Sequence, residues 1–404
     1  MSTTTAVARL WDVASFVRGI TFKPDDVVPA ETPGSVLCMR TKNVQSELDL
    51  SDVWAVGREL VRREDQYLRA GDILVSSANS WNLVGKCCWV PELASPSSFG
   101  GFISVLRAEP SRVNARYLYH WFSAPRTQAT VRSFGQQTTN ISNLNFERCL
   151  KLPLPLPPLP EQRRIAEALD RADELRAKRR QALAHLDDLT QSIFLDMFGD
   201  PARNPRTWPM TRIEDVAEVQ GGLQLSGSRS KLPIEVPYLR VANVYRGRLD
   251  LAEIKTLRAS EAEVARTSLR THDLLIVEGH GNAEEIGRAA LWDGSVSPCV
   301  HQNHLIRARF GPTRIVPVFA SYYVNSPGGR RHLLRAGKTT SGLNTISVGD
   351  VRSTPIATPP LDLQHTFAHR VAKVEVLKAA HRGSLAELNA LFASVQDRAF
   401  RGLP

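Results

Sequence analysis

The sequence predicts an α+β protein: two mixed α/β, strand-rich domains, related by internal duplication and separated by two long helices in an antiparallel coiled coil. Three observations support this fold class. The second half of the 404-residue chain repeats the first half. Each half begins with about 150 residues of short apolar runs, and each ends in one long apolar stripe at helical spacing. The length also suits two or three domains.

The duplication is clearest at the end of each half. Residues 157–198 align with residues 359–400 without a gap, and 14 of these 42 positions are identical. Weaker matches link shorter segments, such as residues 68–75 with residues 269–276. Framework positions match while the stretches between them differ. This pattern indicates two copies of one fold that carry different surfaces.

The duplication divides the chain into four segments. They are a first domain at 1–155, a proline-rich lead-in and first long helix at 156–200, a second domain at 201–357, and a second long helix at 358–404. Inside the domains, apolar runs such as DILVSS and HLIRARF are bounded by Gly, Pro, Asn and Ser, which is typical of strands joined by loops. The lead-ins LPLPLPPLP and TPIATPPL are expected to be extended and polyproline-like.

Both long helices carry apolar residues at alternating spacings of three and four, the pattern of a coiled-coil seam. The seam residues are Ile165, Leu169, Ala172, Leu183, Leu186, Ile193 and Met197 in the first helix, and Phe367, Val371, Val374, Leu385, Leu388, Val395 and Ala399 in the second. We expect the two helices to pair in antiparallel orientation. The alternative is that each helix packs only on its own domain.

Polar residues interrupt both seams at matching positions. They are Arg176 and Arg179 in the first helix, and Lys378 and His381 in the second. A polar residue in a seam can fix the register of a coiled coil. Leu175 and Leu377 lie next to the interruptions, and we expect them to fill part of each gap.

The charge balance favours an acidic partner. The chain has 51 Lys and Arg against 41 Asp and Glu, a formal net charge of +10, and nucleic acid is the usual partner of such a chain. The alternative is a basic but inert surface. The first helix carries eight acidic residues against seven Lys and Arg, so we expect most of the excess positive charge on the domains.

The sequence lacks the motifs expected of a self-contained enzyme. Both Pro-Pro pairs are followed by leucine, so the Asn/Asp-Pro-Pro-aromatic motif of adenine methyltransferases is missing. Gly337-Lys338-Thr339 resembles the end of a phosphate-binding loop but lacks the first glycine of that motif. The five cysteines form no C-x-x-C pair, which indicates reduced thiols and argues against a zinc site. The absence of about 18 consecutive apolar residues excludes a membrane span.

Four segments carry a family resemblance. They are PLPPLPEQRRIAEALD at 155–170, LRAKRRQALAHLDDLTQSIFLDMFGDP at 175–201, EEIGRAA at 284–290 and CVHQNHLIRAR at 299–309. Together with the alternating order of domain and helix, they resemble the specificity (S) subunit of type I restriction-modification systems. The resemblance covers essentially the whole chain. It is weaker in the second helix, where Leu361-Asp-Leu-Gln364 departs from the Leu-Pro-Glu-Gln pattern of the first.

The resemblance implies a non-catalytic chain with two target recognition domains, each recognising one half of a split, asymmetric DNA sequence. It also implies a scaffold for two adenine methyltransferase (M) subunits and, in the full complex, for restriction-translocation (R) subunits. S-adenosylmethionine, ATP and Mg are then expected on those partners, with no cofactor bound by this chain. The implied location is the cytoplasm of a prokaryotic cell, at its nucleoid DNA.

DNA contacts are expected from equivalent loops of the two domains, because Asn and Gln can bond adenine edges while Arg and Lys can bond guanine. The candidates in the first domain are Lys42, Asn43, Asn79, Ser80, Trp81, Asn82, Lys86, Gln136, Gln137, Thr138 and Asn140. Those in the second are Asn243, Tyr245, Arg246, His280, Asn282, Arg288, Lys338, Thr339, Thr340 and Asn344. For any single residue, the alternative is a role in a turn or a helix cap.

Two other functions fit the same sequence. One is a free-standing bipartite DNA-binding or architectural protein without enzyme partners. The other is a coiled-coil interaction scaffold that ignores nucleic acid. Salt-sensitive DNA binding would exclude the scaffold, and capture of a methyltransferase would exclude the free-standing protein.

Overall fold

The structure, a computed structural model, describes residues 6–137, 141–311, 313–340 and 343–401. The chain forms two compact units: unit 1 contains residues 1–180 and 383–404, and unit 2 contains residues 181–382. Two helices of 40 residues, α4 (Leu159–Phe198) and α9 (Leu361–Phe400), pass from one unit into the other. Each unit therefore holds one strand-rich domain and one half of each long helix.

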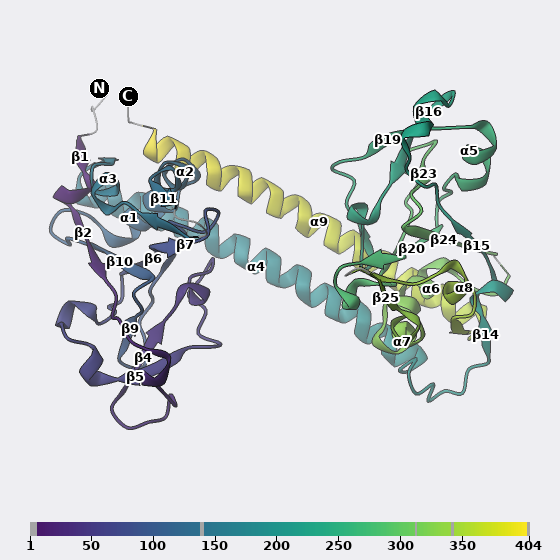
Figure 1. Cartoon of the computed structure of the whole chain (residues 1–404), viewed down its shortest axis with the longest axis horizontal. Coiled ribbons are helices and arrows are strands. Elements are labelled where there is room, and N and C mark those ends of the chain that lie inside the picture. The colour runs from purple at the N-terminus through teal and green to yellow at the C-terminus, as the bar shows by residue number, and fades with distance from the viewer. Residues whose placement is uncertain (1–5, 138–140, 312, 341–342, 402–404) are drawn as a thin grey trace. The chain divides into compact units, whose positions relative to one another are not determined.

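The domain of unit 1 has a four-stranded antiparallel sheet at its centre, with the strand order β2-β10-β6-β8 (Figure 1). The strands of this domain are β1 (Val7–Arg9), β2 (Ala14–Arg18), β3 (Val27–Val28), β4 (Ser35–Met39), β5 (Trp54–Gly57), β6 (Ile73–Ser76), β7 (Ala78–Asn79), β8 (Cys87–Trp89), β9 (Ser97–Phe99), β10 (Ile103–Ala108), β11 (Gly135–Gln137), β12 (Ser142–Leu144) and β13 (Pro153–Pro155). The helices are α1 (Ala115–Phe122), α2 (Pro125–Ser133) and α3 (Phe146–Leu150). A second sheet has the order β3-β5-β4-β9, and a small third sheet has the order β11-β12-β7.

Strand alternation explains how the central sheet is covered on both faces. Ile73, Val75 and Leu106 point into a core shared with α1 and α2. Leu74 and Val105, the neighbours of these residues, point into a second core shared with β4 and β9. Successive side chains of a strand face opposite ways, so the continuous apolar runs in the sequence correspond to strands that are buried on both sides.

Unit 2 repeats this architecture. Its strands are β14 (Met210–Arg212), β15 (Ala217–Gly221), β16 (Ile234–Leu239), β17 (Val244–Tyr245), β18 (Arg248–Leu249), β19 (Lys255–Ala259), β20 (Leu274–Val277), β21 (Gly279–His280), β22 (Ala289–Leu291), β23 (Val300–His301), β24 (Leu305–Phe310), β25 (Lys338–Thr340), β26 (Leu343–Thr345) and β27 (Pro355–Ala357). Its helices are α5 (Glu261–Thr267), α6 (Pro317–Asn325), α7 (Pro327–Ala336) and α8 (Val348–Arg352). The central sheet β15-β24-β20-β22 and the small sheet β21-β26-β25 match those of unit 1. The predicted duplication and fold class are confirmed.

A charged pair is repeated in both central sheets. Arg107 of β10 donates to both carboxylate oxygens of Asp72 at 2.7 and 2.6 Å. In unit 2, Arg309 of β24 donates to both oxygens of Asp273 at 2.7 Å. Both aspartates are buried, and each also accepts the backbone N–H three residues earlier. The Leu-Arg-x-x-Asp match in the sequence therefore marks a turn. The aspartate of this turn binds an arginine on an inner strand of the central sheet.

Helices α4 and α9 run in opposite directions within each unit. In unit 1 the guanidinium of Arg176 donates to Asn389 at 2.7 Å, and in unit 2 the ammonium of Lys378 pairs with Asp187 at 2.7 Å. Between these two pairs the residue number rises by eleven along α4 and falls by eleven along α9, as one antiparallel register requires. All 14 predicted seam residues are buried or half-buried. The predicted coiled coil is confirmed.

The polar interruptions of the seam hold cross-helix contacts. Lys378 is almost fully buried and binds Glu375 on its own helix as well as the partner carboxylate. The expectation that Leu175 and Leu377 fill these gaps is wrong, because both side chains are about half exposed (49% and 52%). The long stems of Arg176 and Lys378 occupy the seam instead, with their charged ends paired.

A buried glutamine fixes the start of each long helix to its domain. The side-chain oxygen of Gln162 accepts the backbone N–H of Asn114 at 2.8 Å, and its nitrogen donates to the carbonyl of Pro157 at 2.8 Å. Gln364 makes the equivalent bonds with Val316 and Pro359. The second helix has Leu-Asp-Leu-Gln where the first has Leu-Pro-Glu-Gln, but it keeps the glutamine, Gln364, that anchors the helix.

The proline-rich lead-ins are extended, as expected, but part of each lead-in is a strand. β13 pairs with β1, and β27 pairs with β14, in two-stranded antiparallel sheets. A narrow sheet with free edges tolerates proline, which cannot donate to a neighbouring strand. Within the part of the chain that the structure describes, no helix is long and apolar enough to cross a membrane.

Candidate nucleic-acid interface

In unit 1 the small sheet β11-β12-β7 brings two predicted loops together. Asn79 of β7 lies opposite Ser142 of β12, and Gln136 of β11 lies opposite Asn143. A Cβ atom at Gly135 would lie 3.4 Å from the ring of Trp81, which places that ring against β11. The loop at residues 79–82 and strand β11 thus form one surface.

Unit 2 builds the same surface from β21-β26-β25. His280 of β21 and Thr339 of β25 both lie opposite Asn344 of the central strand β26. The matched positions of the two ladders are Asn79 with His280, Ser142 with Asn344, and Gln136 with Lys338. The backbone frame is therefore shared, while its side chains differ in charge and in hydrogen-bonding groups.

The glycine that follows the first predicted loop is required by the fold. Gly85 and its counterpart Gly287 both have positive φ angles, 83° and 71°. A side chain there would also meet Val131 at 2.7 Å in unit 1, or Leu333 at 2.9 Å in unit 2. Only glycine adopts this conformation readily in so little space, so the two loops leave the small sheet along the same path.

Several candidate side chains are exposed on or beside the small sheets. Ser80, Trp81, Asn82 and Gln136 are exposed in unit 1, and Asn282 and Lys338 are exposed in unit 2. Asn79 and Asn282 also support their own turns: the side-chain oxygen of Asn79 accepts the N–H of Ser80, and that of Asn282 accepts the N–H of Glu284. These two residues have the local role that was the alternative to DNA contact.

Asn43 and Asn243 are framework residues. Asn43 is fully buried, and its side-chain nitrogen donates to the carbonyls of Asp49 and Asp52 at 2.7 and 2.9 Å. Asn243 makes the same bonds with Asp250 and Glu253. The side-chain amide of each asparagine is used in hydrogen bonds inside its own loop. Asn43 and Asn243 are therefore not part of the proposed interface. Asn43 and Asn243 each end an Arg-x-x-Asn segment that occurs in both halves, and in each half this segment closes a loop.

Three basic candidates, Lys42, Lys86 and Arg246, make hydrogen bonds or ion pairs with neighbouring loops. Lys42 pairs with Asp52, and Lys86 donates to the side chain of Gln45. Arg246 donates to the backbone carbonyls of Asn325 and Glu284. These bonds bring the loops at residues 42–45 and 245–246 alongside the loops that precede β8 and β22.

Arg288 is buried under this surface. It donates to Glu285 at 2.7 Å and to the carbonyl of Val241 at 3.2 Å, and its guanidinium lies 5.0 Å from the ring centre of half-buried Tyr245. Arg288 therefore supports the loops and does not reach outward. Thr138 and Asn140 lie outside the described residues, and Gln137, Thr339 and Thr340 are described only by their backbone.

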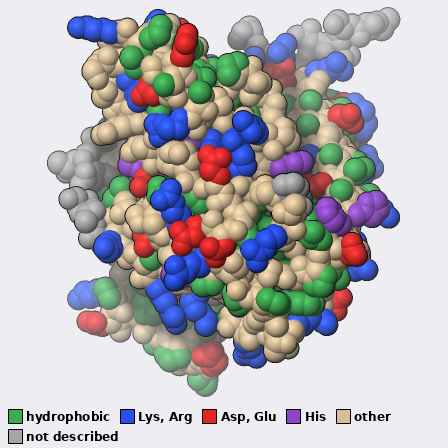
Figure 2. Space-filling view, turned by 90° about the vertical axis from the view of Figure 1, so that its right-hand side faces the viewer, with side chains coloured by type: hydrophobic (Ala, Val, Ile, Leu, Met, Phe, Trp, Pro, Cys, Tyr) green, Lys and Arg blue, Asp and Glu red, His purple; other side chains and the backbone are tan. Residues whose placement is uncertain are grey.

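Positive charge does not form a single patch on the face shown in Figure 2. On that face, Lys and Arg side chains lie among Asp and Glu side chains. Helices α4 and α9 together carry as many acidic as basic residues, 12 each, so the net charge of +10 belongs to the rest of the chain. Among the residues that the structure describes, no three His, Cys, Asp or Glu side chains form a group that could hold a metal.

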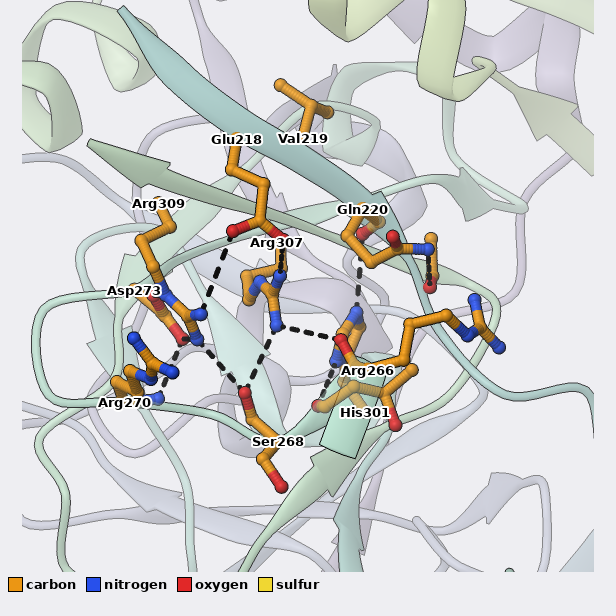
Figure 3. Close-up of polar contacts among 12 residues, drawn as sticks. Glu218, Val219, Gln220, Arg266, Ser268, Arg270, Asp273, His301, Arg307 and Arg309 are labelled. Carbon is orange, nitrogen blue, oxygen red and sulfur yellow. Dashed lines mark hydrogen bonds and ion pairs between the residues drawn. The ribbon is translucent and has the colours of Figure 1, made fainter. Parts of the chain in front are cut away.

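A buried polar network links the strands of the central sheet in unit 2 (Figure 3). Arg307 of β24 donates to the carbonyls of Arg266 and Ser268 at 3.2 and 3.1 Å and pairs with Glu218 of β15. His301 lies between the carbonyls of Thr267 and Gln220, at 3.2 and 3.3 Å. His301 is therefore a buried core residue.

Three residues that the sequence analysis did not select lie beside the small sheets. Phe102 in unit 1 and His304 in unit 2 occupy equivalent turns, and Glu278 precedes β21. Each is the first or last residue of an apolar run, FISVLRA, DLLIVE or HLIRARF, and such a run predicts a strand. The two runs that begin with Phe102 and His304 share only Arg107 and Arg309, so the change from Phe102 to His304 gave no distinct signal.

Comparison with known proteins agrees with this architecture. Residues 7–185 match the family model described as the type I restriction modification DNA specificity domain. The type I restriction enzyme EcoKI specificity subunit from Escherichia coli strain K12 is 28% identical over 426 residues, covering 98% of this chain and 88% of the relative. The StySPI specificity subunit from Salmonella potsdam is 26% identical, with the same coverage. Over almost its whole length, the chain is therefore similar to type I restriction enzyme specificity subunits.

Two solved structures are similar to this chain in fold. The S subunit of a type I restriction-modification system from M. genitalium has a TM-score of 0.57 at 12% identity, over 98% of this chain and 96% of that one. A chain from a structural study of type I restriction-modification complex assembly has a TM-score of 0.54 at 18% identity, over 98% and 97%. The fold shared with these structures therefore spans essentially the whole chain.

Proposed function

We propose that this chain is the sequence-specific DNA-recognition subunit of a type I restriction-modification complex, and that each domain recognises one half of a bipartite, asymmetric site. The observation that carries the proposal is the shared frame of the two small sheets, which presents Gln136 in one unit and Lys338 in the other. Glutamine pairs with adenine through two bonds, whereas lysine donates to guanine. Two copies of one frame with different donors and acceptors suit two different half-sites.

The long helices have a separate role in this proposal. They connect the two domains as a spacer, and buried Gln162 and Gln364 fix each helix to its domain. We propose that this spacer sets the distance between the half-sites. In the proposed complex this chain is not catalytic. S-adenosylmethionine, ATP and Mg are bound by the partner subunits.

Exposed leucines on the long helices support docking of two copies of one partner. Leu175 and Leu391 lie in unit 1, and Leu189 and Leu377 lie in unit 2; each is between 47% and 55% exposed. The duplication relates Leu175 to Leu377 and Leu189 to Leu391, so each unit presents one residue of each kind. We propose that each set binds one methyltransferase (M) subunit, and that restriction (R) subunits join the full complex. A free-standing DNA-binding protein would have no use for exposed apolar residues repeated in this way.

Substitution at the two matched positions tests the proposed interface. In the chain assembled with its methyltransferase subunits, Gln136→Ala and Lys338→Ala should each relax selection at one half-site, with a loss of about 1–3 kcal/mol of discrimination. Selection from randomised duplexes would measure this loss. Lys231→Ala is the control, because it removes an exposed charge outside the small sheet. Unchanged selection by both variants would remove these loops from the interface.

A further inference from the structure

We propose that a second element contributes base contacts: the turn that carries Phe102 in unit 1 and the equivalent turn that carries His304 in unit 2, the latter together with Glu278. This proposal rests on the proposed function and adds the chemistry of one contact in each half-site. Phe102 would bind an apolar feature of a base, the thymine methyl group. Glu278 and His304 would bind a C·G pair.

Backbone hydrogen bonds fix both turns against the small sheets. In unit 1 the carbonyl of Phe102 accepts the N–H groups of Ser77 and Ala78 at 3.0 and 3.2 Å, and the carbonyl of Ser77 accepts the N–H of Leu144 at 2.8 Å. Because Ala78 belongs to β7 and Leu144 to β12, the turn is joined to the sheet that carries Asn79 and Gln136.

Unit 2 repeats two of these bonds. The carbonyl of His304 accepts the N–H of Glu278 at 3.0 Å, and the carbonyl of Glu278 accepts the N–H of Ile346 at 2.9 Å. Glu278 therefore corresponds to Ser77, and His304 to Phe102. The backbone of the turn is the same in both units, while the side chains change from an aromatic ring to an ionisable pair.

Phe102 is 64% exposed although it belongs to a buried apolar run. Single exposed apolar residues are common, but Trp81 and Ile141, beside the same small sheet, are also 44% and 43% exposed. The fold does not require an aromatic residue here, because unit 2 builds the same turn with histidine. Apolar side chains are the groups that recognise the thymine methyl in the major groove.

Glu278 and His304 form a polar contact at the position where unit 1 has the apolar ring of Phe102. The imidazole Nδ1 lies 3.2 Å from a carboxylate oxygen of Glu278, and both side chains are partly exposed. The phosphates of DNA repel a carboxylate that faces them, and a hydrogen bond to a base can offset this repulsion. The donor that Glu and Asp recognise on a base is the amino group of cytosine. In its doubly protonated form, the imidazole donates from Nδ1 to Glu278 and from Nε2 to an acceptor of the paired guanine.

Burial raises the pKa of Glu278, while His304 acts in the opposite direction. A partly desolvated carboxylate gains more from a correctly placed donor than an exposed one does. The pair is therefore suited to discriminate among bases and poorly suited to bind DNA non-specifically.

Site selection with variants of these turns tests the proposal. The complex with methyltransferase subunits would carry Phe102→Ala, Phe102→His, Glu278→Gln or His304→Ala, and each would select from randomised duplexes. Both Phe102 variants should lose thymine preference at one position of one half-site, and the Glu278 and His304 variants should lose C·G preference in the other, each by about fivefold or more. Trp11→Ala is the control, since that ring is 50% exposed and lies outside the small sheet.

The possible outcomes separate this proposal from the proposed function. If the unsubstituted complex selects no sequence, the proposed function fails and this proposal falls with it. If the unsubstituted complex selects a split sequence, and the Phe102, Glu278 and His304 variants select the same sequence with unchanged affinity, only this proposal is overturned. Loss confined to one position of the expected half-site supports it.

Discussion

Replacing Asp273 with alanine should lower the free energy of unfolding of the unit 2 domain by about 3–5 kcal/mol, the range for breaking a buried ion pair. The substitution leaves Arg309 without its bidentate partner and the N–H of Arg270 without its acceptor. Because Asp72 and Arg107 make the same contacts in unit 1, Asp72→Ala should have a similar effect there.

Amide hydrogen exchange of the full chain would locate the damage. Asp273→Ala should reduce the protection of β20 and β24 while β6 and β10 keep theirs, and Asp72→Ala should show the reverse. Glu214→Ala is the control, since its pair with Arg212 is exposed and such pairs contribute about 1 kcal/mol or less. Equal losses from Asp273→Ala and Glu214→Ala would show that the buried pair does not hold the central sheet.

The unit 2 domain should lose stability as the pH falls from about 6.5 to about 4, because of His301. Burial is the main cause that lowers the pKa of His301 to about 4. A neutral imidazole carries one N–H, so only one of its two carbonyl contacts can be a hydrogen bond. Between the two pKa values the unfolded chain binds a proton that the folded domain excludes. The resulting loss is about 3 kcal/mol, complete below pH 4 and absent above pH 6.5.

His301→Phe provides the comparison, because Phe99 occupies the equivalent buried position in unit 1. Urea unfolding of both proteins from pH 4 to pH 7.5 would measure the effect. The difference in unfolding free energy between them should shrink or reverse as the pH falls, whatever other groups titrate. A difference that stays constant across this range would mean that His301 keeps its ordinary pKa in the folded domain.

The architecture could be predicted because it is encoded by repeated and periodic features. The 14 identities between residues 157–198 and residues 359–400 marked two helices of equal length, and the three–four spacing marked the residues that face each other. The identities reflect the duplication, and the spacing reflects the 3.6-residue period of the α-helix. Leu175 was misplaced because a seam was assumed to need apolar filling, whereas the stems of Arg176 and Lys378 fill it while their charged ends are paired.

The candidate site was predictable only in part. Sequence analysis selected loops that the fold brings together, since Asn79 and Gln136 lie on one sheet, as do His280 and Lys338. It could not separate exposed residues from framework residues, because Asn43 and Asn79 are the same residue type in similar polar surroundings. Burial and hydrogen-bond partners make that distinction, and both depend on how distant segments pack.

The same limit explains why the Phe102 turn was not selected. An aromatic residue at the edge of an apolar run is usually core, and only the packed turn shows that its ring is exposed. The change from Phe102 to His304 gave no distinct signal, because the two runs share only Arg107 and Arg309. Its meaning depends on the hydrogen bonds that join each turn to its small sheet.

Exchange of one domain tests most directly whether the two halves of the chain recognise DNA independently. Residues 1–155 would be replaced by the corresponding segment of the Salmonella potsdam relative, and methylation-sensitive sequencing of the host genome would identify the modified sites. We expect one half-site to change, with the other half-site and the spacing between them retained. A change in both half-sites would contradict independent recognition by two domains on a common frame.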